Sequence, residues 1–127
     1  MYIISKEFHF SAGHHLNGLP ENHPCSRKHG HNYTVIVELR SPKLDGRGFV
    51  QDYNDLKPMK EFIDNIFDHQ YLNDLAAGPL HLLGQPTAEN IAKTLFDIFK
   101  PDFPLLNAIT VKETDKTSAR YEPGYDE

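Results

Sequence analysis

The sequence predicts an α+β fold in which an antiparallel sheet carries two helices on one face, with the elements in the order ββααββ. Three observations support this prediction. Residues 2–10 and 32–40 alternate between apolar and polar side chains, as half-buried strands do. Two runs between residues 54 and 99 repeat apolar residues at helical spacing, and two more alternating segments, 107–114 and 118–125, follow them. Strands grouped at both ends of a helical pair indicate helices packed on one sheet face.

The first two strands are expected on either side of a long loop. Residues 2–10 alternate loosely, whereas residues 32–40 present one continuous apolar face, made of Tyr33, Val35, Val37 and Leu39. Residues 11–31 contain Gly, Pro, Asn and His without an apolar period, which predicts a loop. Loops of this length in a compact domain are usually functional or disordered.

The first helix is expected after a turn at residues 41–48 and a short extended piece at 49–53. Asn54 or Asp55 can cap it, and Pro58 lies in its first turn, where proline is tolerated. Its buried stripe would consist of Leu56, Met59, Phe62, Ile63, Ile66 and Phe67.

The second helix is expected to begin after Thr87, a good N-cap residue, and to stop at Pro101. Its buried stripe would consist of Ile91, Ala92, Leu95, Phe96 and Phe99. Residues 68–74 would close the first helix, and residues 75–86 form a connection without a clear pattern. The last two strands are expected to make a hairpin around residues 115–116.

The composition fits a single domain that spans residues 1–127. The net charge of -5 argues against nucleic acid or an anionic membrane as the main partner, but it allows a small phosphorylated ligand. No run approaches the length of a membrane span, and the first ten residues do not resemble a signal peptide. A single cysteine cannot form an internal disulfide, so we expect a cytoplasmic protein.

Five of the eight histidines gather in one early region of the chain, at His14, His15, His23, His29 and His31. Residues two apart in a strand point to the same face, so His29 and His31 can direct both rings to one point. His14 follows the neighbouring strand and is the expected third ligand, whereas His15 would point away. Three histidines plus water form a known open zinc arrangement, and neutral imidazoles suit zinc. The alternative is a group of loop histidines that bind no metal.

Cys25 lies four positions before His29 and allows three interpretations. It could complete a closed structural zinc site with the three histidines. It could instead stay free as a nucleophile or base, or it could be a small buried hydrophobe. The polar loop around it, with Arg27 and Lys28, is a poor core. The sequence therefore favours chemistry at Cys25 but does not reject the closed site.

Two further features place ionisable groups where they could act. Asp68 directly precedes His69, and such a pair can orient an imidazole for proton transfer. The alternative is a histidine that lies near the negative end of a helix. Glu113 continues the apolar face of Ile109 and Val111. A buried carboxylate needs partners, so either the strand reaches solvent there or the carboxylate accepts two hydrogen bonds from a planar ligand.

Six motifs follow one another along nearly the whole chain: FSAGHHL, CSRKHGHNY, DYNDLK, DHQYLND, PTAEN and VKET. Together they resemble the 6-pyruvoyltetrahydropterin synthase superfamily. Three residues separate Cys25 from His29, and this spacing resembles that of the family's 6-carboxytetrahydropterin synthase branch, which acts in queuosine biosynthesis. The resemblance implies the tunnelling fold (T-fold) and a homohexamer built as two trimers, with active sites between subunits.

The resemblance also implies a metal site and a base. His14, His29 and His31 match the family's zinc ligands, and Cys25 matches its catalytic proton acceptor. The implied reaction converts 7,8-dihydroneopterin triphosphate to 6-carboxy-5,6,7,8-tetrahydropterin and releases acetaldehyde and triphosphate.

The remaining motifs imply a relay and a pterin pocket. Asp68 and His69 match a relay that assists the catalytic cysteine, and His69 would serve a neighbouring subunit. Glu113 matches the residue that anchors the pterin ring and takes part in catalysis. Thr87 matches a residue that lines the pterin pocket.

Several alternatives stay open at this point. The chain could form 6-pyruvoyltetrahydropterin, shorten the dihydroneopterin side chain in another way, or be a non-catalytic zinc-stabilised binding module. Arg27 and Lys28 could bind the triphosphate or form a solvated turn. Residues 75–85 form a longer connection than in many relatives, which we expect to lie away from the motif residues. His15 is assigned no role.

Overall fold

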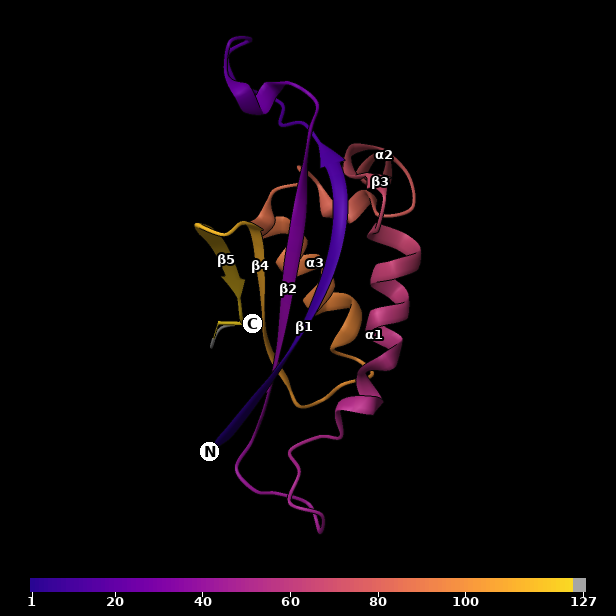
Figure 1. Ribbon diagram of the computed structural model, residues 1–127, viewed down its shortest axis with the longest axis vertical. Helices are drawn as coiled ribbons and strands as arrows, with labels where there is room; N and C mark the ends of the chain where they lie inside the picture. Colours follow the sequence, from indigo (N-terminus) through magenta and orange to yellow (C-terminus); the bar gives the residue numbers. More distant parts are fainter. Residues whose placement is uncertain (125–127) are drawn as a thin grey trace.

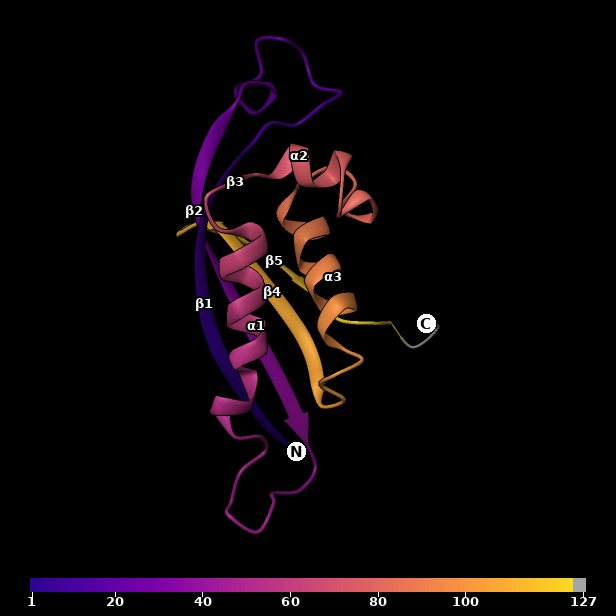
Figure 2. The ribbon, with the colours of Figure 1, turned by 90° about the vertical axis from the view of Figure 1, so that its right-hand side faces the viewer.

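In the computed structural model, which describes residues 1–124, a five-stranded sheet is covered by helices on one face (Figures 1 and 2). The strands lie in the order β3-β1-β2-β4-β5. Their bounds are Tyr2–His14 for β1, His29–Ser41 for β2, Gln70–Tyr71 for β3, Leu106–Thr114 for β4 and Thr117–Tyr121 for β5. Neighbouring strands are antiparallel, except that β3 runs parallel to β1. This arrangement confirms the predicted α+β class; the end of the predicted strand 118–125 lies outside the described residues.

The helical layer contains more elements than the two predicted helices. Its α-helices are Lys57–Phe62 (α1), Leu72–Ala77 (α2) and Ala88–Phe99 (α3), with 3-10 turns at Pro24–Ser26, Tyr53–Leu56 and His81–Leu83. A π-helical turn at Ile63–Phe67 continues α1, and it is closed by a hydrogen bond from the Asp68 N–H to the Ile63 carbonyl. Within the described part of the chain, no helix has the length and apolar character needed to cross a membrane.

The segment before α1 differs from the prediction. Residues 49–53 do not form a strand, because the Asp45 carboxylate accepts a hydrogen bond from the Phe49 N–H at 3.0 Å and folds this region into a turn. Asp52, and not a residue of the predicted pair 54–55, provides the N-cap of the first helical turn.

β1 and β2 are longer than predicted and include the histidines at their ends. They pair in register up to the opposed residues His14 and His29. The apolar alternation stops before these ends because the added residues are small or polar. Gly13 lies opposite Gly30, and a Cβ at Gly13 would lie only 3.3 Å from the His29 carbonyl oxygen. Glycine therefore lets the two strands stay paired as far as the histidines.

Residues 68–77 contain two elements that the sequence pattern does not reveal, β3 and α2. β3 pairs with Ala12 and Gly13 of β1, and α2 begins directly after it. Both elements are too short for a period to be recognised in the sequence. The order is therefore ββααββ with one short strand and one short helix inserted between the predicted helices.

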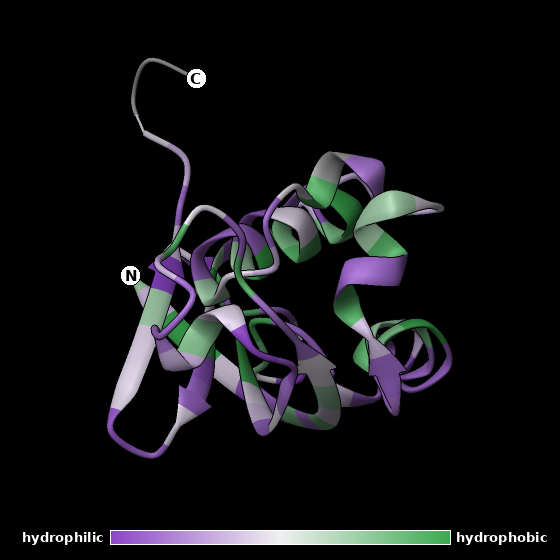
Figure 3. Cartoon of the chain, turned by 90° about the horizontal axis from the view of Figure 1, so that it is seen from above, coloured by the Kyte–Doolittle hydropathy of each residue, from purple (hydrophilic) through white to green (hydrophobic). Residues whose placement is uncertain are grey.

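The core lies between the sheet and the helices. Phe10 of β1 stacks on Tyr33 of β2 with ring centroids 4.7 Å apart, and Phe67 packs against Phe10 from the helical layer. Figure 3 shows hydrophilic and hydrophobic residues alternating along the strands, as expected of a sheet with one buried face. All five residues of the predicted α3 stripe are buried. The apolar face of the sheet thus leads directly to the histidines at its end.

Leu95→Ala is expected to lower the free energy of unfolding by about 2–5 kcal/mol, because Leu95 is fully buried and its truncation leaves a cavity. Chemical denaturation followed by circular dichroism measures this loss. Leu44→Ala is the matched control, since Leu44 is exposed and its loss should cost less than about 0.5 kcal/mol. Equal losses in the two variants would contradict the assignment of α3 to the core.

Candidate active site

Three histidines form a cluster on the helix-facing side of the sheet, at the end of β1 and β2. His14 lies opposite His29 in the strand pairing, and His31 lies opposite Ala12. The ring centroids are 4.5 to 5.1 Å apart. One ring nitrogen from each of the three residues lies within 4.8 Å of the others, so the group could hold a metal ion. The structure therefore brings together the three predicted ligands.

Backbone carbonyls set the orientation of two of these rings. The His14 Nδ1 lies 2.7 Å from the Pro86 carbonyl oxygen, and the His29 Nδ1 lies 2.7 Å from that of Arg27. A carbonyl only accepts hydrogen bonds, so each Nδ1 carries the proton and each Nε2 keeps its lone pair. Such a bond on the second nitrogen is the usual support of a metal-binding histidine.

Buried ring nitrogens without a partner are a second reason why the cluster fits a metal. The Nε2 atoms of His14 and His31 are buried, and neither has a hydrogen-bond partner within residues 1–124. Buried polar atoms without a partner are uncommon and costly. A metal ion bound by the three rings would supply the missing partner.

Burial also favours the neutral form of two histidines of the cluster. Burial lowers the pKa of both His14 and His31, although the Glu113 carboxylate opposes this shift at each residue. The His14 and His31 rings are therefore neutral at neutral pH, the form in which an imidazole binds a metal. Tyr33 forms the floor of the cluster, with its hydroxyl 3.3 Å from the His14 Nδ1, and burial raises its pKa, so it stays protonated.

Glu113 lies beside the cluster on the neighbouring strand β4. Its Oε2 is 3.9 Å from the His31 Nε2, and its side chain is 23% exposed. The strand end therefore reaches solvent in part, as one of the two sequence interpretations expected. A concavity of about 490 Å³ next to Glu113 is lined by α3 and β5 residues such as Ala88 and Thr117. Thr87 caps α3 at this edge, as predicted, by accepting a hydrogen bond from the Asn90 N–H.

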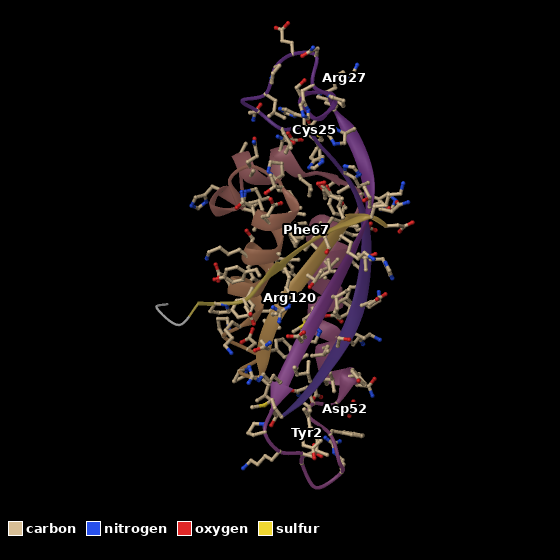
Figure 4. All side chains as sticks on the ribbon, turned by 90° about the vertical axis from the view of Figure 1, so that its left-hand side faces the viewer. Tyr2, Cys25, Arg27, Asp52, Phe67 and Arg120 are labelled. Atoms are coloured by element: carbon tan, nitrogen blue, oxygen red, sulfur yellow. The ribbon has the colours of Figure 1, made fainter. Side chains whose placement is uncertain are left out.

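Cys25 lies in the loop beyond the strand ends and is half-buried. Figure 4 shows it at the end of the molecule opposite to Tyr2 and Asp52, which is the end where β1 finishes at the histidines. Its carbonyl oxygen accepts a hydrogen bond from the Leu16 N–H at 2.7 Å. Among the described residues, the group spaced for a metal consists of the three histidines and does not include Cys25.

Asp68 and His69 form a pair at the other edge of β1. The Asp68 Oδ1 accepts a hydrogen bond from the Ser11 N–H at 2.9 Å, and its Oδ2 lies 2.8 Å from the His69 Nδ1. The His69 N–H donates to the Ser11 carbonyl, and its φ of 60° is an uncommon conformation for a residue other than glycine. These bonds hold the predicted Asp–His pair firmly on the strand.

The Asp–His pair stands apart from the group of side chains spaced for a metal, which among the described residues consists of the three histidines. The His69 side chain is 82% exposed and lines an open concavity with Ser11 and Asn32 that also reaches His31 of the cluster. Ser11 and Asn32 alternate with the buried residues of β1 and β2, so they face away from the helices. The pair is therefore exposed on the outer face of the sheet, and the concavity beside it extends to His31.

The sequence did not reveal two supporting groups of the cluster. Tyr33 was predicted only as a strand residue, although its position two residues after His31 places it on the same face. The Pro86 carbonyl left no signal, because a backbone acceptor can belong to any residue type. His15 lies outside the cluster, as predicted, and its Nδ1 contacts the Tyr71 hydroxyl.

The fold and the cluster define an α+β protein with a candidate three-histidine metal site at the end of an antiparallel sheet. The sequence model of the 6-pyruvoyl tetrahydropterin synthase family matches residues 3–124. The chain belongs to this family, which confirms the resemblance found in the motifs.

Individual relatives agree with this assignment over nearly their whole length. The chain is 36% identical to the 6-carboxy-5,6,7,8-tetrahydropterin synthase of Synechocystis, over 95% of this chain and 93% of that protein. It is 30% identical to the Bacillus subtilis protein of the same name, over 96% and 86%. The solved structure of the Caenorhabditis elegans 6-pyruvoyl tetrahydropterin synthase superposes with a TM-score of 0.79 at 27% identity and covers 98% of both chains. These neighbours confirm the predicted T-fold.

Asp68→Asn is expected to reduce the loss of stability in acid. The hydrogen bond from Ser11, followed by that from His69, lowers the pKa of Asp68 below its ordinary value of 3.8. The stabilisation is therefore present above pH 3.8 and disappears as the pH falls through the lowered pKa. Thermal unfolding between neutral pH and about pH 2 measures the slope. Asp115→Asn, in the exposed β4–β5 turn, should keep the wild-type slope, and an unchanged slope in Asp68→Asn would contradict the prediction.

Proposed function

We propose that this chain is a zinc-dependent carbon–carbon lyase that converts 7,8-dihydroneopterin triphosphate and water to 6-carboxy-5,6,7,8-tetrahydropterin, acetaldehyde and triphosphate. The observation that carries the proposal is the three-histidine cluster with unpartnered Nε2 atoms beside Glu113. Family membership and the names of the Synechocystis and Bacillus subtilis relatives support this reaction. We further propose that the chain is a single-domain, cytoplasmic enzyme of the queuosine pathway.

Zinc is the proposed metal because three neutral imidazoles with an open fourth position suit it. When bound, it supplies a Lewis acid that makes the protons beside the substrate's side-chain hydroxyls easier to remove. The protein's own contribution is to hold His14 and His29 in the ligand tautomer through the Pro86 and Arg27 carbonyls.

Cys25 is the proposed base that accepts a proton next to the pterin ring. It lies in the loop at the same end of the molecule as the histidines, and Leu16 fixes its carbonyl. His69 is the proposed proton donor on the other side of the substrate. With its Nδ1 held by Asp68, its exposed Nε2 is the atom free to exchange the proton.

Glu113 and Thr87 are the proposed pterin-binding residues. The Glu113 carboxylate borders the concavity at the start of α3, which Thr87 caps. A pterin presents neighbouring N–H groups on one edge, and the two oxygens of a carboxylate can each accept a hydrogen bond from one of them. This contact would fix the ring so that the side chain extends toward the histidines.

We propose that a second chain completes the active site, because His69 is 82% exposed on the outer face of the sheet and does not belong to the three-histidine group. The edges of the sheet support such an assembly. β3 pairs with β1 only at Ala12 and Gly13, and within the described residues no strand covers the remainder of that edge or the outer edge of β5. Two different open edges can pair head to tail and close a ring. We therefore propose a homohexamer of two trimers, in which His69 serves the Cys25 of a neighbour.

Cys25→Ala is expected to lower turnover of dihydroneopterin triphosphate by a factor of about 10² to 10⁴, since the base is lost. The zinc content, measured by atomic absorption, should not change, because the histidines bind the metal without sulfur. Loss of zinc in this variant would favour the closed structural site, and unchanged turnover would exclude Cys25 as the base.

The product distinguishes the proposed reaction from its nearest alternative. The Caenorhabditis elegans neighbour is named as a 6-pyruvoyl tetrahydropterin synthase, which keeps that product as the second candidate. Incubation of the purified chain with dihydroneopterin triphosphate and zinc should give 6-carboxytetrahydropterin by mass spectrometry, together with acetaldehyde. A tetrahydropterin that keeps its three-carbon side chain, without acetaldehyde, would contradict the proposal.

A further inference from the structure

Two side-chain amides tie the loop that carries Cys25 to the helical layer. The Asn73 Oδ1 accepts a hydrogen bond from the His15 N–H at 2.9 Å, and its Nδ2 donates to the His15 carbonyl at 3.0 Å. The Gln85 Oε1 accepts from the Asn17 N–H at 2.8 Å, and its Nε2 donates to the Asn17 carbonyl at 3.0 Å. Each amide thus satisfies both backbone groups of one loop residue, as a neighbouring strand would do.

The residue between these two clamped positions contacts Cys25. Leu16 donates its N–H to the Cys25 carbonyl at 2.7 Å. Hydrogen bonds hold the backbone of His15 and Asn17, the residues before and after Leu16. The N–H of Leu16 therefore has little freedom to move. The position of Cys25 therefore depends on the two amides, although neither of them has a hydrogen bond to it.

Both amides belong to segments that are themselves fixed. The Gln85 carbonyl accepts hydrogen bonds from the Asn90 side chain and from the Thr87 N–H, each at 2.8 Å. Asn90 lies in the first turn of α3, a well-packed helix. Asn73 lies in the first turn of α2, next to the fully buried Leu72. The loop is therefore connected to two helices of the core.

The same segment also orients a ligand of the candidate metal site. Pro86 directly follows Gln85, and its carbonyl oxygen accepts the hydrogen bond from the His14 Nδ1. Neighbouring residues of one short segment thus hold both the histidine and the loop. The expectation that residues 75–85 lie away from the motif residues is wrong at Gln85, whose side chain bonds Asn17 directly after the FSAGHHL motif and whose carbonyl accepts a hydrogen bond from Asn90 of the PTAEN motif.

We propose that Asn73 and Gln85 are positioning residues that hold the Cys25 loop at a fixed distance from the histidine cluster. The proposal rests on the proposed function, because it assigns the purpose of this rigidity to Cys25 acting as the base. Proton transfer is sensitive to displacements of about 1 Å, so a loosened loop lowers the rate of the chemical step more than the binding of substrate.

Gln85→Met and Asn73→Leu test this proposal, because each keeps the approximate size of the side chain and removes both hydrogen bonds. Gln51→Met is the matched control, since the Gln51 amide bonds the exposed Asp55 in the turn before α1. Cys25 is the only cysteine, so iodoacetamide labels one thiol and intact mass spectrometry follows its rate. Alkylation is expected to be at least about fivefold faster in both variants, because the half-buried thiol opens more often.

The kinetic readout separates positioning from general stability. kcat for dihydroneopterin triphosphate should fall about 10- to 100-fold in both variants, with KM within about twofold of the wild-type value. Gln85→Glu keeps the acceptor for the Asn17 N–H and should give an alkylation rate between those of the wild type and Gln85→Met. It replaces Gln85→Met in the test if that variant does not fold.

If Gln85→Met and Asn73→Leu both show the wild-type rate of Cys25 alkylation, the proposal is overturned, even if the midpoints of their thermal unfolding fall. Faster alkylation with unchanged kcat would overturn it as well, because the loop position would then not matter for the chemistry. If the wild-type chain forms neither acetaldehyde nor the carboxylated pterin, the proposed function fails, whereas the alkylation rates still show whether the amides hold the loop.

Discussion

The pairing of β1 with β2 in a single register is the constraint on which the rest of the structure depends. Side chains alternate along a strand, so a slip of β1 by one residue would turn His14 to the face opposite to His29 and His31. The register places His14 opposite His29 and leaves the stacked pair Phe10 and Tyr33 directly below the cluster. The hydrophobic core thus selects the register, and the register assembles the candidate metal site.

The sequence predicted those parts of the molecule that repeat with a period or that lie close together in the chain. The alternation of β2 and the stripe of α3 have clear periods, and the spacing of His29 and His31 is itself a strand signal. The Asp68–His69 pair is adjacent in sequence, so its hydrogen bond could be foreseen. Family resemblance added the roles, which spacing alone does not assign.

Other parts could not be predicted, for physical reasons that differ between them. The ends of β1 and β2 lack apolar residues, so their pairing through Gly13 and Gly30 has no hydrophobic signature. The Pro86 carbonyl acts through the backbone, which carries no sequence information. The contacts of Asn73 and Gln85 join positions that are 58 and 68 residues from their partners, and amide side chains are common on any surface.

The π-helical turn after α1 determines which way the Asp68–His69 pair points. Its wider turn ends in the hydrogen bond from Asp68 to Ile63, at the position where the carboxylate meets Ser11. Each residue of an α-helix advances the chain by about 100° around the axis. Removing one residue to restore a regular helix would therefore rotate Asp68 away from β1. The angular phase of one helix, and not only the identity of Asp68 and His69, thus decides whether this pair is bound to β1.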